Sequence, residues 1–404
     1  MTNKEAYIID AIRTPIGKLR GALSPIRADD LAALPVKELL KRNQNVDPGQ
    51  VEDVILGCAN QAGEDNRNVA RMASLLAGLP QTVPGETVNR LCASGMSSTV
   101  RAYQAIKAGE GRLFVTGGME HMTRGPIVLG KGSRRYSGTN EMHDTTFGWR
   151  FVNPKMDKQY GSESMGETAE NIIDEYDVNR EDQDKFAAWS QQKAAEATRS
   201  GRMAKEIMPV SVPRRKQEPF IFEEDEFIRP KTTVEILSKL KPAFRKGGSV
   251  TAGNASGLND GACAILVAND AAIGDYDLQP KARIVASAVV GVAPRIMGMG
   301  PVGAAQKVLK RAGLTMDKMD VIELNEAFAA QSLAVLRELN IADDDERVNP
   351  NGGAIALGHP LGMTGARLLQ TATVELHEQK NYKYALCMLC VGVGQGMAVV
   401  LEKV

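Results

Sequence analysis

Short strand-forming runs alternate with helical patterns in both the first and the last third of this 404-residue chain. In the first third, the predicted strands are residues 7–12, 53–57 and 113–116, with a helix at 66–77. In the last third, the predicted strands are residues 284–292, 321–324, 384–389 and 397–401, with helices at 302–312, from 326 and from 364. Such alternation is typical of βαβ units, so it predicts an α/β fold with a largely parallel sheet.

The two ends of the chain resemble each other. The run at 53–57 parallels the run at 320–324. The turn at Cys92, which opens a helix, parallels the turn at His359, which precedes the helix from 364. Because equivalent segments recur at nearly the same separation along the chain, we predict two similar α/β domains.

The stretch 119–248 has a different composition. It is richer in Arg, Lys, Gly, Pro and Asp, has few strand signals, and contains two helical patterns at 167–176 and 181–199. We interpret it as an inserted loop domain that supplies ligand contacts. The predicted domains are residues 1–118 plus 249–270, the insertion 119–248, and residues 271–404.

Composition narrows the class of protein. Lysine plus arginine and aspartate plus glutamate are balanced, 49 against 49, which argues against nucleic acid or an anionic membrane as a partner. We find neither a secretory signal nor a run apolar enough to span a bilayer. Five cysteines without regular spacing suit a reducing compartment. We therefore expect a soluble, cytoplasmic protein.

Cys92 is the first candidate for chemistry. It lies in Asn89-Arg-Leu-Cys-Ala-Ser-Gly95, where a turn meets a helical run. At a helix N-terminus, backbone N–H groups and the helix dipole favour the thiolate, and small neighbours leave the thiol accessible. The plain alternative is a buried structural cysteine.

His359 and Asn325 form the next two candidates. His359 ends a glycine-rich segment that begins at Asn351, and Pro360 stiffens the turn that presents the imidazole. The alternative is a surface turn histidine. Asn325 and Glu326 follow a predicted strand, at the sheet edge where α/β sites gather; the alternative for Asn325 is a helix N-cap.

The fourth candidate is Cys390. It follows Cys387 in a C-x-x-C pair, which can indicate a redox or zinc site. We reject that interpretation, because residues three apart on a strand face opposite sides and no second ligand pair exists. No G-x-S-x-G elbow supports a hydrolase. The glycine spacing from Gly392 does not fit a dinucleotide-binding fingerprint.

Taken in chain order, five segments resemble the signature blocks of the thiolase family. These segments are 89–95 (N-R-L-C-A-S-G), 251–257 (T-A-G-N-A-S-G), 325–328 (N-E-A-F), 352–360 (G-G-A-I-A-L-G-H-P) and 390–396 (C-V-G-V-G-Q-G). The resemblance covers the full length. It implies two α/β domains in a five-layer αβαβα core with an inserted loop domain, assembled as a homodimer or homotetramer.

The resemblance also implies a ping-pong cleavage of 3-ketoacyl-CoA. Cys92 is the nucleophile, activated by His359 or Cys390, and Cys390 protonates the acetyl-CoA enolate. One oxyanion site is His359 with a water held by Asn325; the other is formed by the N–H groups of Cys92 and Gly392. Coenzyme A and acyl-CoA are substrates, and no bound cofactor or metal is expected.

Contacts to CoA follow from the same resemblance. Ser256 and Phe244 match positions along the pantetheine tunnel, and Arg229 matches a position near the adenine and its phosphates. A surface ion pair is the alternative for Arg229. Met165 belongs to the substrate loop. Acetoacetyl-specific relatives carry histidine before this methionine, whereas Ser164 stands here.

Several segments resemble the 3-oxoadipyl-CoA and other degradative 3-ketoacyl-CoA thiolases, namely 58–68, 145–151 and 390–396. A substrate ending in a carboxylate needs a cation in the acyl tunnel. The candidates in the inserted region are Arg150, Arg134, Arg135 and Lys131. The alternatives are an acetoacetyl-CoA thiolase, a decarboxylating ketoacyl synthase and a non-catalytic thiolase-like lipid carrier. The synthase pairs its cysteine with two histidines, and the carrier lacks Cys92 or His359.

Overall fold

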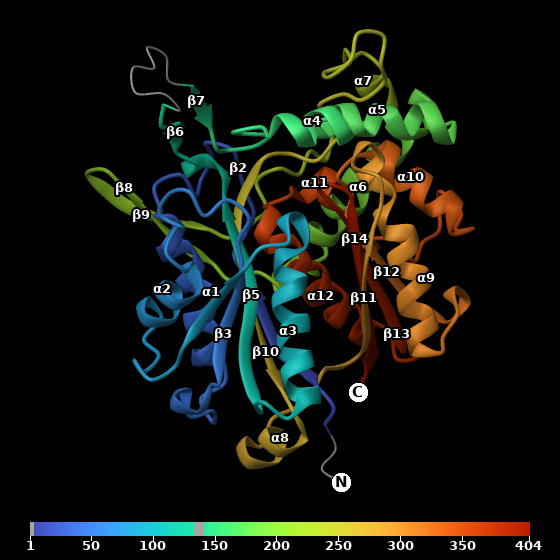
Figure 1. The fold of residues 1–404 in the computed structure, drawn as a ribbon. Coiled ribbons are helices and arrows are strands. Elements are labelled where there is room, and N and C mark those ends of the chain that lie inside the picture. Colours follow the sequence, from blue (N-terminus) through green and yellow to red (C-terminus); the bar gives the residue numbers. More distant parts are fainter. Residues whose placement is uncertain (1–3, 133–140) are drawn as a thin grey trace.

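The computed structural model describes residues 4–132 and 141–404 (Figure 1). The first half of the fold contains β1 (Tyr7–Arg13), β2 (Gly17–Lys18), α1 (Ala28–Arg42), β3 (Asp53–Gly57), α2 (Val69–Leu76), β4 (Gly85–Val88), α3 (Ser94–Ala108), β5 (Leu113–His121), β10 (Asn259–Ala268) and α8 (Asp270–Tyr276). The second half contains β11 (Ala282–Gly291), α9 (Gly300–Ala312), β12 (Val321–Leu324), α10 (Ala329–Glu338), α11 (Ala354–Leu357), α12 (Leu361–Glu378), β13 (Tyr384–Val391) and β14 (Gln395–Lys403).

Ten of the described strands form one sheet, in the order β12-β13-β14-β11-β1-β10-β5-β3-β4, with β2 paired to β10. The prediction of a largely parallel sheet is wrong. Only β3–β4, β3–β5 and β12–β13 are parallel among the pairs of this sheet. The tight turn between β13 and β14 forces an antiparallel hairpin, and β10, which returns from the insertion, pairs antiparallel with both β1 and β5.

The two halves of this sheet and the helices that cover them form five layers, αβαβα, as the resemblance implied. The sheet has two halves, which meet where Tyr7 and Ile8 of β1 pair with Arg283 and Ala282 of β11. Helices α3 and α12 lie between the halves, α1 and α2 cover the outer face of the first half, and α9 and α10 cover that of the second (Figure 1). Separate apolar clusters surround the central helices and lie under each of the two outer helix layers. Helices α3 and α12, one from each half, therefore pack against each other in the central layer.

The inserted region contains β6 (Ile127–Leu129), β7 (Met142–Asp144), α4 (Pro154–Tyr160), α5 (Met165–Tyr176), α6 (Arg180–Arg199), β8 (Val210–Arg214), β9 (Gln217–Phe222) and α7 (Val234–Leu237). Both predicted helices are confirmed within two residues at each end, as α5 and α6. The hairpins β6–β7 and β8–β9 were not predicted. The domain boundaries stay a prediction, and β5 continues past residue 118 to His121. Arg134 and Arg135 lie outside the described residues.

Buried ion pairs attach the insertion to both halves of the core. Arg13 of β1 donates to both carboxylate oxygens of Asp225, at 2.7 and 2.9 Å. Arg202 donates to Glu206 at 2.6 Å and to Glu375 of α12 at 3.1 Å. Such pairs fix geometry, since removing one partner leaves a buried charge uncompensated. No helix among the described residues is long and apolar enough to cross a membrane.

Candidate active site

Cys92 lies in a single 3-10 turn, η2 (Leu91–Ala93), which leads directly into α3. Leu91 has a left-handed backbone (φ 46°), a conformation that a branched residue adopts only when its surroundings enforce it. Here Asn89 holds the turn: its Oδ1 accepts from Leu91 N at 2.9 Å, and its Nδ2 donates to Ala59 O at 3.0 Å. The predicted position at a helix N-terminus is therefore observed.

The thiol of Cys92 is nevertheless not a stabilised thiolate. Desolvation raises its pKa to about 11, although hydrogen bonds from the backbone N–H groups of Gly392 and of Cys92 itself lower it, and the charge of Glu120 raises it further. The two N–H groups favour the thiolate, but loss of solvent outweighs them, so the net shift of the Cys92 pKa is upward. These N–H groups do converge on the sulfur, at the two positions predicted for an oxyanion site.

His359 is held in a buried turn between α11 and α12. Gly358 has φ 105°, and a side chain there would meet Asn259, since an added Cβ would lie 2.4 Å from Asn259 Cγ. Asn259 Oδ1 accepts from His359 N at 3.0 Å. With only 5% of its surface exposed, His359 is not the surface turn residue of the plain alternative.

The hydrogen bonds of the His359 ring define its tautomer. The Thr364 hydroxyl donates its one proton to Pro360 O at 2.8 Å. Its oxygen therefore accepts from His359 Nδ1 at 2.7 Å, which puts the proton of the neutral ring on Nδ1 and leaves a lone pair on Nε2. Burial, followed by the charge of Arg367, lowers the pKa of His359 to about 3. The ring is a neutral base with Nε2 as its acceptor atom.

Asn325 lies beside that acceptor atom. Its backbone N donates to Met388 O at 3.0 Å, which fixes the segment after β12 against β13, and its Nδ2 lies 3.4 Å from His359 Nε2. Its Oδ1 is buried and has no hydrogen-bond partner among the described residues. The N-cap alternative is wrong, because α10 begins at Ala329. Asn325 therefore has an oxygen available for a substrate or water contact.

Cys390 is the last residue but one of β13, with 1% of its surface exposed. Burial raises its pKa above the ordinary value, and the nearby Cys92 raises it further. Cys387 faces the other side of the strand, where its Sγ donates to Leu368 O at 3.5 Å. The two thiols belong to different apolar clusters, so the rejection of a C-x-x-C redox or zinc pair is supported by the structure.

Glycines let α3 and α12 cross closely enough to bring the two turns together. A Cβ on Gly95 would lie 2.6 Å from Gly362 O, and one on Gly365 would lie 2.5 Å from Met96 N. Contacts this short exclude any side chain. The turn with Cys92 precedes α3 and the turn with His359 precedes α12, so this crossing sets the spacing of the site.

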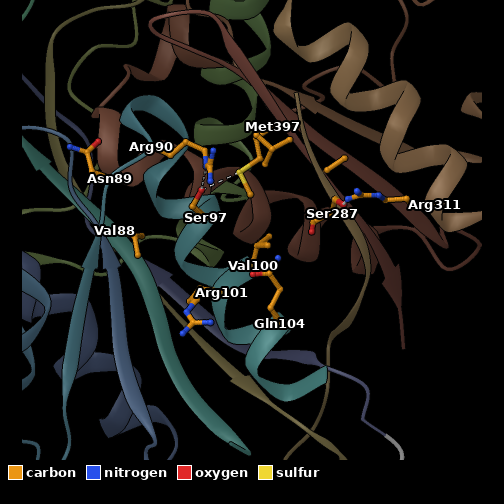
Figure 2. Close-up of a pocket in the computed structure, with 12 residues that line it drawn as sticks. Val88, Asn89, Arg90, Ser97, Val100, Arg101, Gln104, Ser287, Arg311 and Met397 are labelled. Atoms are coloured by element: carbon orange, nitrogen blue, oxygen red, sulfur yellow. Dashed lines mark hydrogen bonds between the residues drawn. The ribbon is translucent and has the colours of Figure 1, made fainter. Parts of the chain in front are cut away.

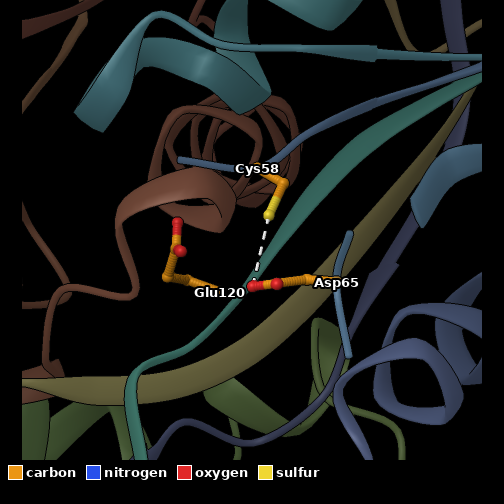
Figure 3. Close-up of side chains that lie close together, drawn as sticks. All are labelled: Cys58, Asp65 and Glu120. Atoms are coloured by element: carbon orange, nitrogen blue, oxygen red, sulfur yellow. Dashed lines mark hydrogen bonds between the residues drawn. The ribbon is translucent and has the colours of Figure 1, made fainter. Parts of the chain in front are cut away.

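Glu120, near the end of β5, joins the loop after β3 to the first turn of α12; Figure 3 shows it with its neighbours Cys58 and Asp65. Its carboxylate accepts from Ala59 N and Asn60 N at 3.0 Å and from Gly362 N at 2.8 Å. Burial raises its pKa to about 7 against these hydrogen bonds. It lies close to Cys58 and Asp65, but backbone N–H groups and the Cys58 thiol occupy the carboxylate oxygens. We interpret this cluster as a loop anchor.

Three of the predicted CoA-contacting residues lie around one apolar cluster that contains Cys390. Met165 packs against it. Ser256 N donates to Ala327 O at 3.0 Å, and the Phe244 ring meets that of Phe328 edge-on, with centroids 6.2 Å apart. Arg229 is not part of this cluster; it lies on an exposed loop with its guanidinium 5.7 Å from the ring of Phe227. Arg229 forms no ion pair with an acidic residue among the described residues, so the alternative of a surface ion pair is not supported.

Sequence reasoning missed the residues that hold the predicted ones. The contact of Thr364 with His359 could have been predicted from the sequence, because Thr364 lies one helical turn after Pro360 and five residues after His359. Asn259 and Glu120 carried no local signal; they reach the site through contacts across a hundred residues or more.

A surface hollow of about 380 Å³ lies between α3, β11, α9 and β14 (Figure 2). Ser97 is one of its lining residues; its Oγ accepts from Arg90 Nε at 2.9 Å and donates to Met397 Sδ at 3.3 Å. The four candidate catalytic residues described above do not line it. It is therefore separate from the candidate site, although Asn89 and Arg90 belong to the turn that carries Cys92.

Comparison with protein families matches residues 6–271 to the N-terminal domain of thiolases and residues 278–403 to the C-terminal domain of thiolases. The two matches together span nearly the whole chain and meet between the halves of the fold.

Relatives and solved structures agree with this result. The β-ketoadipyl-CoA thiolase of Acinetobacter baylyi is 57% identical over 401 residues, with 99% of this chain and 100% of the relative covered. The 3-oxoadipyl-CoA/3-oxo-5,6-dehydrosuberyl-CoA thiolase of Escherichia coli is 59% identical with the same coverage. A human mitochondrial 3-ketoacyl-CoA thiolase in complex with CoA superimposes with a TM-score of 0.90 at 39% identity, with 99% and 98% of the two chains covered. The chain belongs to the thiolase family.

Proposed function

We propose that this thiolase cleaves 3-oxoadipyl-CoA with coenzyme A to give succinyl-CoA and acetyl-CoA, with Cys92, His359, Asn325 and Cys390 as its catalytic residues. The observation that carries the proposal is the buried pair of a neutral His359 and Asn325: Asn325 Nδ2 lies 3.4 Å from the acceptor atom His359 Nε2, and Asn325 Oδ1 has no partner among the described residues. The two candidate thiols, Cys92 and Cys390, lie close enough to perturb each other. The full-length similarity to β-ketoadipyl-CoA thiolases supports the substrate.

In the first half-reaction, His359 Nε2 takes the proton of Cys92 while Sγ bonds to C3 of the 3-ketoacyl-CoA. The C2–C3 bond then breaks, giving the acyl-enzyme and the enolate of acetyl-CoA. The N–H groups of Cys92 and Gly392 hold the oxygen on C3, and the newly formed Nε2–H of His359 faces the enolate oxygen, with Asn325 beside it. One such donor commonly contributes about 3–4 kcal/mol. Cys390 gives its proton to C2 and releases acetyl-CoA.

In the second half-reaction, the Cys390 thiolate takes the proton of incoming CoA, and the CoA sulfur attacks the acyl-enzyme. The C–S bond to Cys92 breaks, and the Cys92 sulfur recovers its proton from His359. Atoms and protons balance without a further reactant. Met165, Phe244 and Ser256 are proposed to line the acyl and pantetheine path, and Arg229 is proposed to contact the phosphorylated nucleoside of CoA.

The test is a comparison of purified protein on 3-oxoadipyl-CoA, 3-oxohexanoyl-CoA and acetoacetyl-CoA, with products identified by mass spectrometry. We expect succinyl-CoA and acetyl-CoA from the first substrate, with kcat/KM roughly tenfold or more above that for 3-oxohexanoyl-CoA. Equal values would indicate a broad-range enzyme, and a preference for acetoacetyl-CoA would make it an acetoacetyl-CoA thiolase. Binding without turnover would point to a carrier.

We also propose that the chain forms a homodimer or homotetramer. The hairpin β6–β7 exposes large apolar side chains: Ile127 at 66%, Leu129 at 62% and Met142 at 68%. A cluster of this kind is typical of an interface, and β4 is an edge strand of the large sheet. Light scattering of Leu129→Asp should show a smaller assembly than wild type; an unchanged mass would remove this hairpin from the interface.

A further inference from the structure

Two adjacent residues of the segment 145–151 contact different segments next to the candidate site. Arg150 Nη2 donates to Asn60 Oδ1 at 3.1 Å and to Asn60 O at 3.3 Å. Trp149 Nε1 donates to Glu163 O at 3.1 Å, two residues before Met165. Met165 in turn reaches Gly392, where its Sδ would lie 3.9 Å from an added Cβ.

Asn60 ties this segment to the nucleophile's turn. Asn60 N donates to Glu120 at 3.0 Å, and its neighbour Ala59 accepts from Asn89, the residue that holds Leu91 and hence Cys92. Arg150 is therefore two hydrogen-bonded steps from the turn that carries Cys92, and it is half-buried.

The guanidinium of Arg150 is bonded only to neutral oxygens among the described residues. Besides the two Asn60 atoms, its Nη1 donates weakly to Thr145 O at 3.4 Å, and its Nε makes no hydrogen bond within residues 4–132 and 141–404. Other arginines near the insertion are paired with carboxylates: Arg124 with Glu64, Arg245 with Glu167 and Arg295 with Glu175. A half-buried cation without an acidic partner is suited to receive an anion from a ligand.

We propose that Arg150 binds the distal carboxylate of the acyl chain and so selects dicarboxylic 3-ketoacyl-CoA substrates. This rests on the proposed function, because it assigns a residue to that substrate's charged end. Asn60 and Thr145 hold the guanidinium in place through their oxygens, and its unused N–H groups form charge-assisted hydrogen bonds to the carboxylate. An uncharged acyl chain leaves those donors without a partner, so it is penalised.

The other described cation of the insertion that the sequence suggested, Lys131, is exposed and lies two residues after the end of β6. It is the matched control. The experiment measures kcat/KM for 3-oxoadipyl-CoA, its 6-methyl ester and 3-oxohexanoyl-CoA in wild type, Arg150→Gln, Arg150→Lys and Lys131→Gln. The ester keeps the length of the substrate and removes its charge.

We expect wild type and Lys131→Gln to prefer the diacid over the ester roughly tenfold to a hundredfold. Arg150→Gln should reduce that ratio to near one. Arg150→Lys keeps the positive charge and loses the paired donors of the planar guanidinium, so it should give an intermediate ratio. If Arg150→Gln is unstable, the ratio in Arg150→Lys tests the proposal instead. A ratio near one in wild type would refute the proposed substrate. A wild-type preference that survives in both Arg150 variants, or that falls only in Lys131→Gln, would overturn the role of Arg150 and leave the substrate standing.

Discussion

Replacing Thr364 by valine should slow acylation of Cys92 without greatly weakening the fold. Valine keeps the shape and branching of threonine, so the change removes the hydroxyl and little else. His359 Nδ1–H, which donates to that hydroxyl at 2.7 Å, would then be buried without a partner. The ring would be driven toward the tautomer with its proton on Nε2, which is unable to accept the proton of Cys92.

The size of the effect follows from the cost of an unsatisfied buried donor, about 1–3 kcal/mol. If that cost is carried by the base-competent tautomer, the acylation rate falls roughly fivefold to 150-fold. The assay is rapid mixing of enzyme with 3-ketoacyl-CoA, with the first turnover of acetyl-CoA followed by quench and mass spectrometry. Thr364→Ser keeps the hydroxyl and should retain most of the rate.

Thr373 provides a matched control in the same helix. It is buried to the same degree and its hydroxyl also donates to the carbonyl four residues earlier, Leu369 O, at 2.8 Å, but it contacts no imidazole. Thr373→Val therefore measures the loss of an equivalent hydroxyl alone. If Thr364→Val and Thr373→Val acylate at equal rates, the tautomer argument is wrong. The same holds if nitrogen NMR of histidine-labelled wild type finds the proton of His359 on Nε2.

Three other outcomes are expected. The rate of Cys92 alkylation by iodoacetamide should rise about tenfold per pH unit from pH 6 to 9, because the thiol pKa is about 11; a plateau near neutrality would contradict this. Cys390→Ala should still form the acyl-enzyme on Cys92 but lose turnover about 10²–10⁴-fold and fail to exchange deuterium into the methyl group of acetyl-CoA; normal exchange would transfer the role to another group. The pKa of Glu120 is raised to about 7 in the fold, so the stability linked to its protonation is full below its ordinary value and is lost as pH rises through 7. Urea unfolding should show this as a decline of about 3 kcal/mol from pH 4.5 to 8 relative to Glu120→Gln, and a pH-independent difference would refute it.

The sequence predicted those strands whose ends are marked by a local change from apolar to polar residues. The strands at 53–57 and 321–324 coincide with β3 and β12, because each is a short apolar run bounded by polar residues. β10 was missed although it is central to the sheet: all of its ten residues are buried, so it lacks the alternation that marks a half-exposed strand. The sheet's direction was misjudged for a related reason, since pairing across an insertion leaves no trace in periodicity.

The candidate site divides in the same way. Cys92, His359, Asn325 and Cys390 stood out because turns, glycines and strand ends surround them in sequence. The net upward shift of the Cys92 pKa was not predicted, because a helix N-terminus is visible in sequence whereas desolvation depends on which distant segments cover the thiol. Arg150 illustrates the converse. Sequence offered it as one of several cations in a loop, and only its neutral partners in the fold distinguish it from Arg124 or Arg245.

The resting charges of the two acylation partners constrain how the reaction begins. With the Cys92 pKa at about 11 and that of His359 at about 3, the resting pair is a neutral thiol and a neutral imidazole, and moving a proton from thiol to imidazole before any other event is uphill. One oxyanion donor offsets about 3–4 kcal/mol, and it acts only once charge has reached the carbonyl oxygen. A thiolate formed in advance is therefore unfavourable in this buried site. We expect proton transfer and carbon–sulfur bond formation to be coupled, so that the negative charge passes directly from the sulfur to an oxygen held by the N–H groups of Cys92 and Gly392.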